Sequence, residues 1–173
     1  MMVRENNMNK TKKLTVLSLL TTCALVLSYV EAILPPLSAT VPGIKAGLCN
    51  IIILFVLYRF SFKAAVAVSG VRLLVVMLLF SNPTTFIYSL AGAALSLAVM
   101  ALLKRCGIFS IMGVSVAGAV CHNLGQIIVA AVVLGTLQIG YYMIILAITG
   151  SVAGVFVGLA GAGLLKATRK MKM

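Results

Sequence analysis

Acidic residues are the scarcest feature of this sequence. Among 173 residues there are two, Glu5 and Glu31, against 14 lysines and arginines. Charged residues make up only 9% of the chain and hydrophobic residues 62%, which leaves too little polar surface to cover a soluble core. Tryptophan is absent, so the aromatic residues at the membrane interfaces must be tyrosine and phenylalanine. The composition predicts a single all-helical membrane domain and excludes a soluble enzyme.

Cysteine and histidine motifs are equally sparse. The four cysteines are Cys23, Cys49, Cys106 and Cys121, and no two of them form a CxxC pair. Three lie within apolar segments, where a small buried side chain is a commoner role than a disulfide or a metal ligand. One histidine, His122, supplies too few ligands for a metal site. We therefore expect no catalytic residue, no metal and no cofactor.

The net charge of +12 suggests nucleic-acid binding at first sight. A nucleic-acid binder, however, spreads its basic residues over one solvated face, with aromatic residues among them. Here the basic residues stand in small groups at the ends of apolar runs, where anionic lipid headgroups attract them. We interpret the charge as a signal of membrane topology, with lipid and not nucleic acid as the partner.

Apolar runs predict six transmembrane helices between two basic cytoplasmic tails, 1–13 and 166–173. The first run, 14–34, is roughly 20 residues long, enough to cross the hydrocarbon core and too long for a cleavable signal peptide. The other runs are 48–58, 62–80, 85–103, 111–134 and 139–165, with a turn at 81–84. The second run is short, so it must recruit 42–47 or lie in a protein-lined region.

The positions of the basic residues predict the orientation of the chain. With the N-terminus inside, twelve of the 14 basic residues fall in cytoplasmic segments, Lys45 falls outside and Arg72 lies within the bilayer. This positive-inside asymmetry places both termini in the cytoplasm of a bacterial cell, with the chain crossing the cytoplasmic membrane several times.

Small residues recur at every fourth position in two of the predicted helices. The first helix carries Ala24, Ser28 and Ala32, and the last carries Gly150, Gly154, Gly158 and Ala162. This spacing puts them on one helical face, where missing side chains let two backbones approach closely. The last-helix stripe indicates packing within the chain. The first-helix stripe is compatible with internal packing or with docking against another membrane subunit.

Two charged residues fall within the apolar runs. Arg72 lies near the middle of its segment, where arginine costs roughly 2.5–3.5 kcal/mol on insertion scales. Glu31 lies within a turn of the outer end of the first helix, so Arg72 can reach it by extending outward. Either the two form a structural pair, or Arg72 binds an anionic or polar ligand.

Further polar residues fall at similar depths. Pro42, Lys45 and Asn50 belong to a predicted helix start, which favours an anion or is simply a capped loop with a solvated lysine. His122 and Gln126 share one helical face and Asn123 lies beside them, either in an inter-helix network or lining a cavity. With Asn82 and Glu31 near the outer face, these residues predict a pocket that opens outward.

Four stretches resemble a known family. They are 42–50 (PGIKAGLCN), 70–72 (GVR), 82–86 (NPTTF) with 89–92 (SLAG), and 118–126 (GAVCHNLGQ). They look like the Gx transporter family, also labelled heptaprenyl diphosphate synthase component I, and the resemblance extends over nearly all of 14–166.

The resemblance carries functional expectations. The family is similar to substrate-binding S components of energy-coupling-factor (ECF) transporters, which implies six helices, an outward pocket, and docking of a transmembrane coupling subunit on Ala24, Ser28 and Ala32. Two separate ATPases would drive uptake, since the chain has no GxxxxGK[ST] motif. Family members also accompany genes for flavin-based extracellular electron transfer and quinone biosynthesis, so an accessory role there is the second hypothesis. A synthase subunit is the third, although without a DDxxD motif this chain cannot hold the magnesium of prenyl transfer alone.

Overall fold

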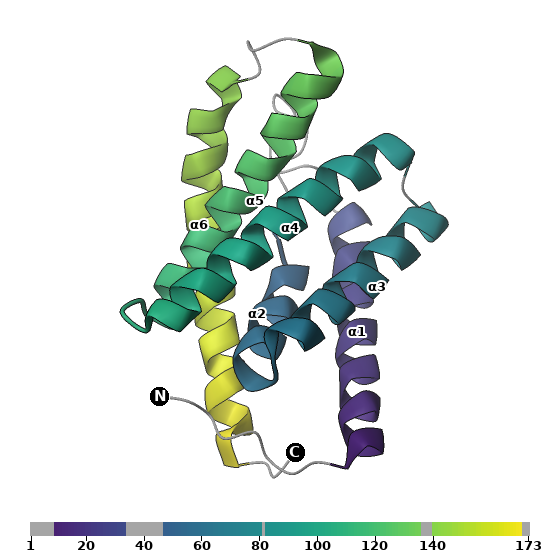
Figure 1. The fold of residues 1–173 in the computed structure, drawn as a ribbon, viewed down its shortest axis with the longest axis vertical. Coiled ribbons are helices and arrows are strands. Elements are labelled where there is room, and N and C mark those ends of the chain that lie inside the picture. The colour runs from purple at the N-terminus through teal and green to yellow at the C-terminus, as the bar shows by residue number, and fades with distance from the viewer. Residues whose placement is uncertain (1–8, 34–46, 81, 136–139, 171–173) are drawn as a thin grey trace.

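The computed structural model describes residues 9–33, 47–80, 82–135 and 140–170. In these ranges the chain forms six α-helices and a short 3-10 turn, with no strand (Figure 1). They are α1 (Lys10–Ile33), α2 (Cys49–Arg59), α3 (Phe62–Phe80), α4 (Pro83–Cys106), α5 (Ile111–Leu134), α6 (Tyr142–Ala167) and η2 (Thr168–Lys170). The predicted all-helical fold with six helices is confirmed.

Five of the described helices are long and apolar enough to cross a membrane, and α2 is the exception. Large hydrophobic side chains cover their outer faces, for example Leu78 at 81% exposed and Phe156 at 68%. Such a surface would aggregate in water, whereas lipid is its natural surrounding. The protein is therefore a multi-pass membrane protein.

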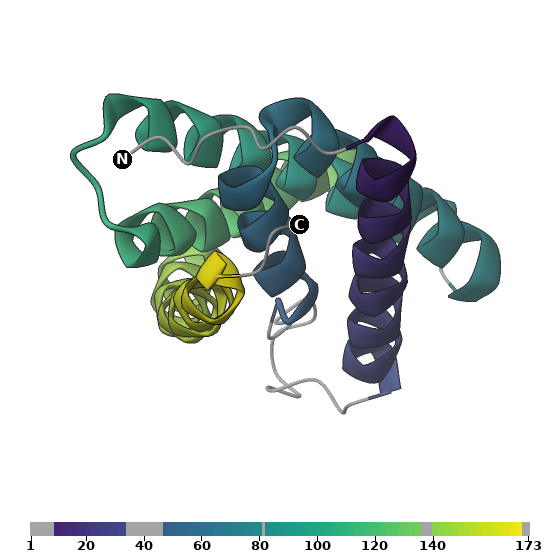
Figure 2. The same ribbon diagram turned by 90° about the horizontal axis from the view of Figure 1, so that it is seen from below.

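The short helix α2 lies at the centre of the bundle, between α1 and α6 (Figure 2). Seven of its 11 residues are buried, and Leu54 and Val56 are fully enclosed. A helix that is apolar on all sides finds partners only inside a protein or in lipid. The predicted protein-lined surroundings of this segment are therefore observed. The other predicted arrangement, an extension of the helix by 42–47, stays a prediction because 42–46 lie outside the described residues.

Some helix ends differ from the sequence prediction. Helix α1 begins at Lys10, four residues before the predicted start. The first turn of a helix is held by backbone hydrogen bonds and does not depend on apolar side chains, so an apolar run does not mark where it starts. In this turn Lys13 N donates to Asn9 O at 3.1 Å. Helix α6 runs on to Ala167, so the predicted tails 1–13 and 166–173 are partly helical.

The predicted turn at 81–84 is likewise shorter than expected. Asn82 caps α4, because its side-chain oxygen accepts from Thr85 N at 2.8 Å, and Pro83 occupies the first helical position. Helix α4 therefore starts two residues earlier than 85. It ends at Gly107, whose φ of 71° is the left-handed conformation that closes many helices.

The helices α4, α5 and α6 pack through glycines. A Cβ on Gly150, Gly154 or Gly158 of α6 would come within 2.9 Å of an α5 atom. A Cβ on Gly125 of α5 would lie 2.8 Å from the carbonyl oxygen of Ala91 in α4. The backbones of these three helices can approach so closely only because side chains are missing there.

The stripe on α1 also faces the interior of the chain. Ala24 is fully buried and Ser28 is 8% exposed, whereas Ala32 is exposed. Within the chain, α2 and α3 cover this face of α1 at Ala24 and Ser28, and docking of a coupling subunit on the stripe stays a prediction. Small residues indicate a close neighbour without identifying it, and here the neighbour is within the chain.

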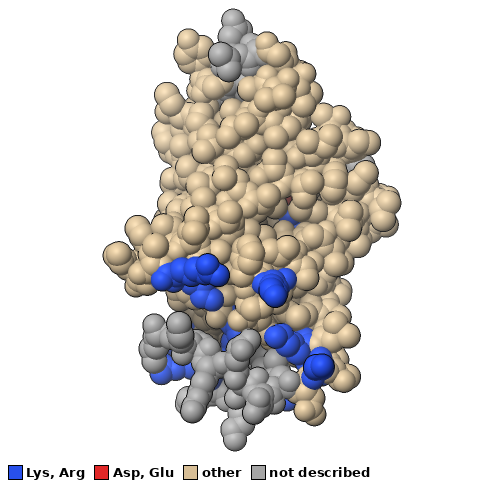
Figure 3. Space-filling view, viewed as in Figure 1, with Lys and Arg blue, Asp and Glu red and all other residues tan. Residues whose placement is uncertain are grey.

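Basic side chains gather at one end of the bundle. Figure 3 shows them over the lower part of the molecule, where α1 begins and where α2, α4 and α6 end (Figure 1). The last turns of these three helices carry Arg59, Lys104, Arg105 and Lys166. The upper part of this face is almost wholly uncharged. This separation is the pattern on which the predicted orientation in the membrane depends.

Candidate ligand-binding cavity

A cavity of about 220 Å³ lies between the α1–α2–α3 side and the α4–α5–α6 side of the bundle. All six helices contribute to its wall. It brings together seven of the eight residues predicted to bind substrate, which are Glu31, Asn50, Arg72, Asn82, His122, Asn123 and Gln126. The eighth, Lys45, lies outside the described residues.

The cavity reaches from the end of the bundle remote from the basic residues into its interior. It is lined by Glu31 near the end of α1, by Asn50 in the first turn of α2 and by Thr85 at the start of α4. The basic residues stand at the opposite ends of the same helices, as Lys10 and Arg59 do. The predicted polar residues therefore line one space, with Glu31 and Asn50 at its outer end and Arg72 and His122 deeper.

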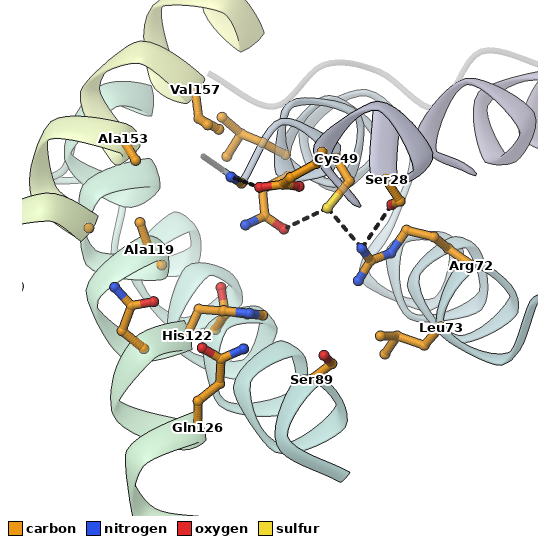
Figure 4. Close-up of a pocket in the computed structure, with 18 of the residues that line it drawn as sticks. Ser28, Cys49, Arg72, Leu73, Ser89, Ala119, His122, Gln126, Ala153 and Val157 are labelled. Atoms are coloured by element: carbon orange, nitrogen blue, oxygen red, sulfur yellow. Dashed lines mark hydrogen bonds between the residues drawn. The ribbon is translucent and has the colours of Figure 1, made fainter. Parts of the chain in front are cut away.

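Arg72 is the one cation that the described residues contribute to this cavity, and it is only 8% exposed. Its Nη1 donates to Ser28 Oγ at 3.2 Å and to Cys49 Sγ at 2.8 Å (Figure 4). Both acceptors are held in turn: Ser28 Oγ donates to Ala24 O at 2.8 Å, and Cys49 Sγ lies 3.9 Å from Asn50 Oδ1. Cys49 is therefore a hydrogen-bonding member of the wall, beyond the small hydrophobe predicted from the sequence.

The guanidinium of Arg72 keeps unused donors. Among the residues that the structure describes, its hydrogen bonds are the two from Nη1, and the buried Nε has no acceptor. No ion pair joins it to Glu31, whose carboxylate instead accepts from the backbone N–H of Gly47 just before α2. The structural Arg72–Glu31 pair considered from the sequence is thus not formed. A buried donor without an acceptor is costly, and a bound ligand would supply one.

His122 and Gln126 project from α5 toward the space that separates them from Arg72 (Figure 4). They are four residues apart and so share one helical face, as predicted. Gly92 of α4 makes room for them, because a Cβ there would lie 2.7 Å from the carbonyl oxygen of His122. Position and spacing both point these side chains at the cavity.

Asn123 and Asn82 have structural partners as well as a place in the wall. Asn123 Nδ2 donates to Leu146 O at 2.8 Å, which joins α5 to α6. Asn82 caps α4. Both residues also line the cavity, so the polar-network and the cavity interpretations both describe Asn123.

The end of the cavity nearest the basic residues is lined by two serines that sequence reasoning missed. Ser96 of α4 is 4% exposed and Ser115 of α5 is 3% exposed. No hydrogen-bond partner for Ser115 Oγ occurs within the described ranges. The signal was present in α4, where Ser89, Gly92 and Ser96 recur at helical spacing on one face.

The sequence profile of the heptaprenyl diphosphate synthase component I family matches residues 20–164. The chain belongs to that family. No curated protein and no solved structure matches it. The predicted family is confirmed.

The family description raises the question of a magnesium–diphosphate site, which the cavity does not fit. Magnesium that carries a diphosphate is held by carboxylates. The cavity offers one carboxylate, that of Glu31. Within the described ranges, no three His, Cys, Asp or Glu residues lie close enough to hold a metal ion. What this wall does present is a cation, several amides and several hydroxyls, which are groups that recognise a small polar or anionic organic molecule.

Proposed function

We propose that this protein is a membrane-embedded binding subunit that captures a small polar or anionic molecule for uptake. The observation that carries the proposal is the cavity: one space inside an apolar bundle, bordered by a buried arginine with unused donors. Polar groups inside a membrane domain are costly and mark a site when they converge. The substrate-binding residues would be Arg72, His122, Gln126 and Asn50, with Glu31, Asn82, Asn123 and Lys45 around them.

The charge pattern supports capture from outside the cell. If the basic end of the bundle faces the cytoplasm, as the positive-inside rule predicts, the end of the cavity at Glu31 and Asn50 lies in the outer half of a bacterial cytoplasmic membrane. A molecule would then enter from the extracytoplasmic side, between the end of α1 and the start of α4. The chain has no nucleotide-binding motif, so release into the cell would depend on a transmembrane coupling subunit and two ATPases. Their docking on Ala24, Ser28 and Ala32 stays a prediction.

The family description favours a second candidate, a non-catalytic component of a prenyl diphosphate synthase. A partner enzyme would have to supply the magnesium site. A heptaprenyl chain is also several times larger than a cavity of about 220 Å³, so it would have to bind on the lipid-facing surface.

Native mass spectrometry of protein purified in mild detergent tests the capture proposal. We expect a retained small molecule in the wild type and its loss in Arg72→Ala, because removing one partner of a buried charged contact costs about 2–5 kcal/mol of binding. Leu78→Ala, on the lipid-facing side of the same helix, is the control that should keep the molecule.

Two outcomes would contradict the proposal: an empty wild type, or equal retention in wild type and Arg72→Ala. Proteins that co-purify separate the alternatives. Two ATPases with a coupling protein support uptake, redox proteins an electron-transfer or quinone role, and a carboxylate-rich enzyme the synthase.

A further inference from the structure

The chemistry of the cavity narrows the class of ligand beyond "polar or anionic", and this step rests on the proposed function. Three of the five N–H donors of the Arg72 guanidinium, on Nε and Nη2, have no acceptor among the described residues. The Nη1 donors are already occupied by Ser28 and Cys49, which also fix the plane of the group. A guanidinium held in this way offers its Nε and Nη2 donors side by side. Two parallel donors match the two oxygens of a carboxylate.

Charge balance separates a monocarboxylate from other anions. Arg72 is the only cation among the described residues that line the cavity, and the same wall already carries the carboxylate of Glu31, which accepts from the Gly47 N–H. A phosphate ester carries about −1.5 to −2 at neutral pH, so it would leave negative charge uncompensated within an apolar bundle. A dicarboxylate would do the same. Of these anions, a monocarboxylate adds the least negative charge to a wall that holds one guanidinium and one carboxylate.

The end of the cavity at Ser96 and Ser115 would bind a neutral hydrogen-bonding group. Ser115 Oγ is buried without a partner in the described part of the chain, and Ser96 lies with it in the same wall. Ser115 precedes His122 by seven residues, so along α5 the cavity extends about 10 Å from the histidine toward this end. Leu54 and Met100 form apolar wall there. A part of the ligand with a hydroxyl or carbonyl and no charge fits such surroundings.

We propose that the ligand is a small monocarboxylate, bound through its two oxygens by Nε and Nη2 of Arg72, with a neutral hydrogen-bonding part reaching Ser96 and Ser115. The volume sets its size. An apolar cavity of about 150 Å³ admits a benzene-sized molecule, so about 220 Å³ holds one ring with a carboxylate and a short substituent.

Cys49 supplies a reporter for the test, because it lines the cavity whereas Cys23 and Cys106 are exposed on the outside and Cys121 is not part of the lining. In a variant with Cys23, Cys106 and Cys121 changed to alanine, Cys49 is the remaining target for N-ethylmaleimide. The rate of its alkylation is measured with four compounds that share one ring and differ in the polar group: benzoate, benzamide, phenyl phosphate and phenylalanine. Isothermal titration calorimetry of the same compounds gives a second measurement that does not depend on thiol reactivity.

Benzoate is expected to bind and to slow alkylation, with an affinity about tenfold or more above that of the other three compounds. Arg72→Lys keeps the charge and loses the paired donors, so it should lose that preference, judged by rates with and without compound in the same variant. Among 2-, 3- and 4-hydroxybenzoate, at least one should bind more tightly than benzoate, and Ser115→Ala should remove the gain.

Other outcomes overturn the inference, each in a distinct way. Preference for phenyl phosphate or benzamide would show the wrong ligand class. Preference for phenylalanine, which is also a carboxylate, would show that the second part of the ligand is charged and not neutral. A capture function would remain in place in each case. Binding of none of the four in calorimetry would remove the monocarboxylate site, and the retained molecule in native mass spectrometry would then decide separately whether the protein captures anything. A hydroxyl that never improves binding would remove the serine end from the proposal.

Discussion

The two sides of the bundle are held together by different means. On the α4–α5–α6 side, glycines let backbones touch, and a Cβ on Gly154 would lie 2.7 Å from Val116 Cα. On the α1–α2–α3 side, the short helix α2 fills the space with large apolar side chains, and Arg72 joins three helices through Ser28 and Cys49. Helices whose backbones touch leave no room for a ligand, whereas helices held apart by side chains can leave a space between them. The cavity lies where the two kinds of packing meet.

The largest effect is expected where backbone meets backbone. Gly154→Leu would force side-chain atoms against the α5 backbone, which cannot yield as a flexible side chain does, and should destabilise the protein by about 3 kcal/mol. Thermal unfolding in detergent measures it. Gly163→Leu on the same helix is the matched control, because a Cβ there meets nothing within 4 Å. Equal unfolding temperatures for the two variants would remove the account of close packing.

A smaller loss is expected from enlarging the buried stripe on α1. Ala24→Leu places extra volume among side chains that can partly rearrange, so the free energy of unfolding should fall by about 1–3 kcal/mol. Cys23→Leu, at the exposed neighbouring position, should have little effect. If Ala24→Leu left stability unchanged and only prevented assembly with a partner, the stripe would be a docking face.

The smallest effect concerns a contact between the two sides near the basic end. Lys104 Nζ of α4 donates to Leu57 O in the last turn of α2 at 2.6 Å and lies 5.2 Å from the ring centroid of Tyr58. Lys104→Met removes both contacts and should cost about 1 kcal/mol of stability. Arg105→Met, at the exposed next residue, provides the comparison. A larger loss for Arg105 would mean that lipid contact and not the α2 terminus dominates here.

Much of the fold follows from pattern alone. The lengths of the apolar runs predicted where the helices lie in the sequence, and α5 has the predicted bounds. The spacing of His122 and Gln126 and the improbable position of Arg72 indicated a shared interior site, because polar groups in an apolar segment have few other places to go. The unbroken apolar run of α2 was a further sign, since a short helix without a polar face must be enclosed.

What the sequence does not contain is the identity of each neighbour. The small residues of α1 and α6 have the same spacing, yet spacing alone cannot tell whether the partner is another part of the chain or a second protein. Ser115 looks like any small residue of a membrane helix until α4 is placed beside it. From the sequence, Lys104 is expected to be a lysine at the membrane interface. Its hydrogen bond to Leu57 O could not be predicted, because it depends on where α2 ends in space. Such contacts are set by the tertiary structure and cannot be predicted from residue spacing.

Solvent access at two positions of α5 shows whether the bundle encloses a cavity that is open to the outside. Gln126 lines the cavity, whereas Ile128 is 51% exposed on the outer surface of the bundle. Each is changed to cysteine in a chain whose four native cysteines are replaced by serine or alanine, and intact cells are treated with a charged, membrane-impermeant thiosulfonate. We expect fast labelling of Gln126→Cys from outside, because the cavity is hydrated, and little labelling of Ile128→Cys, because it faces lipid. Labelling of Ile128→Cys as fast as that of Gln126→Cys, or none at Gln126→Cys, would contradict the account of an outward-open cavity.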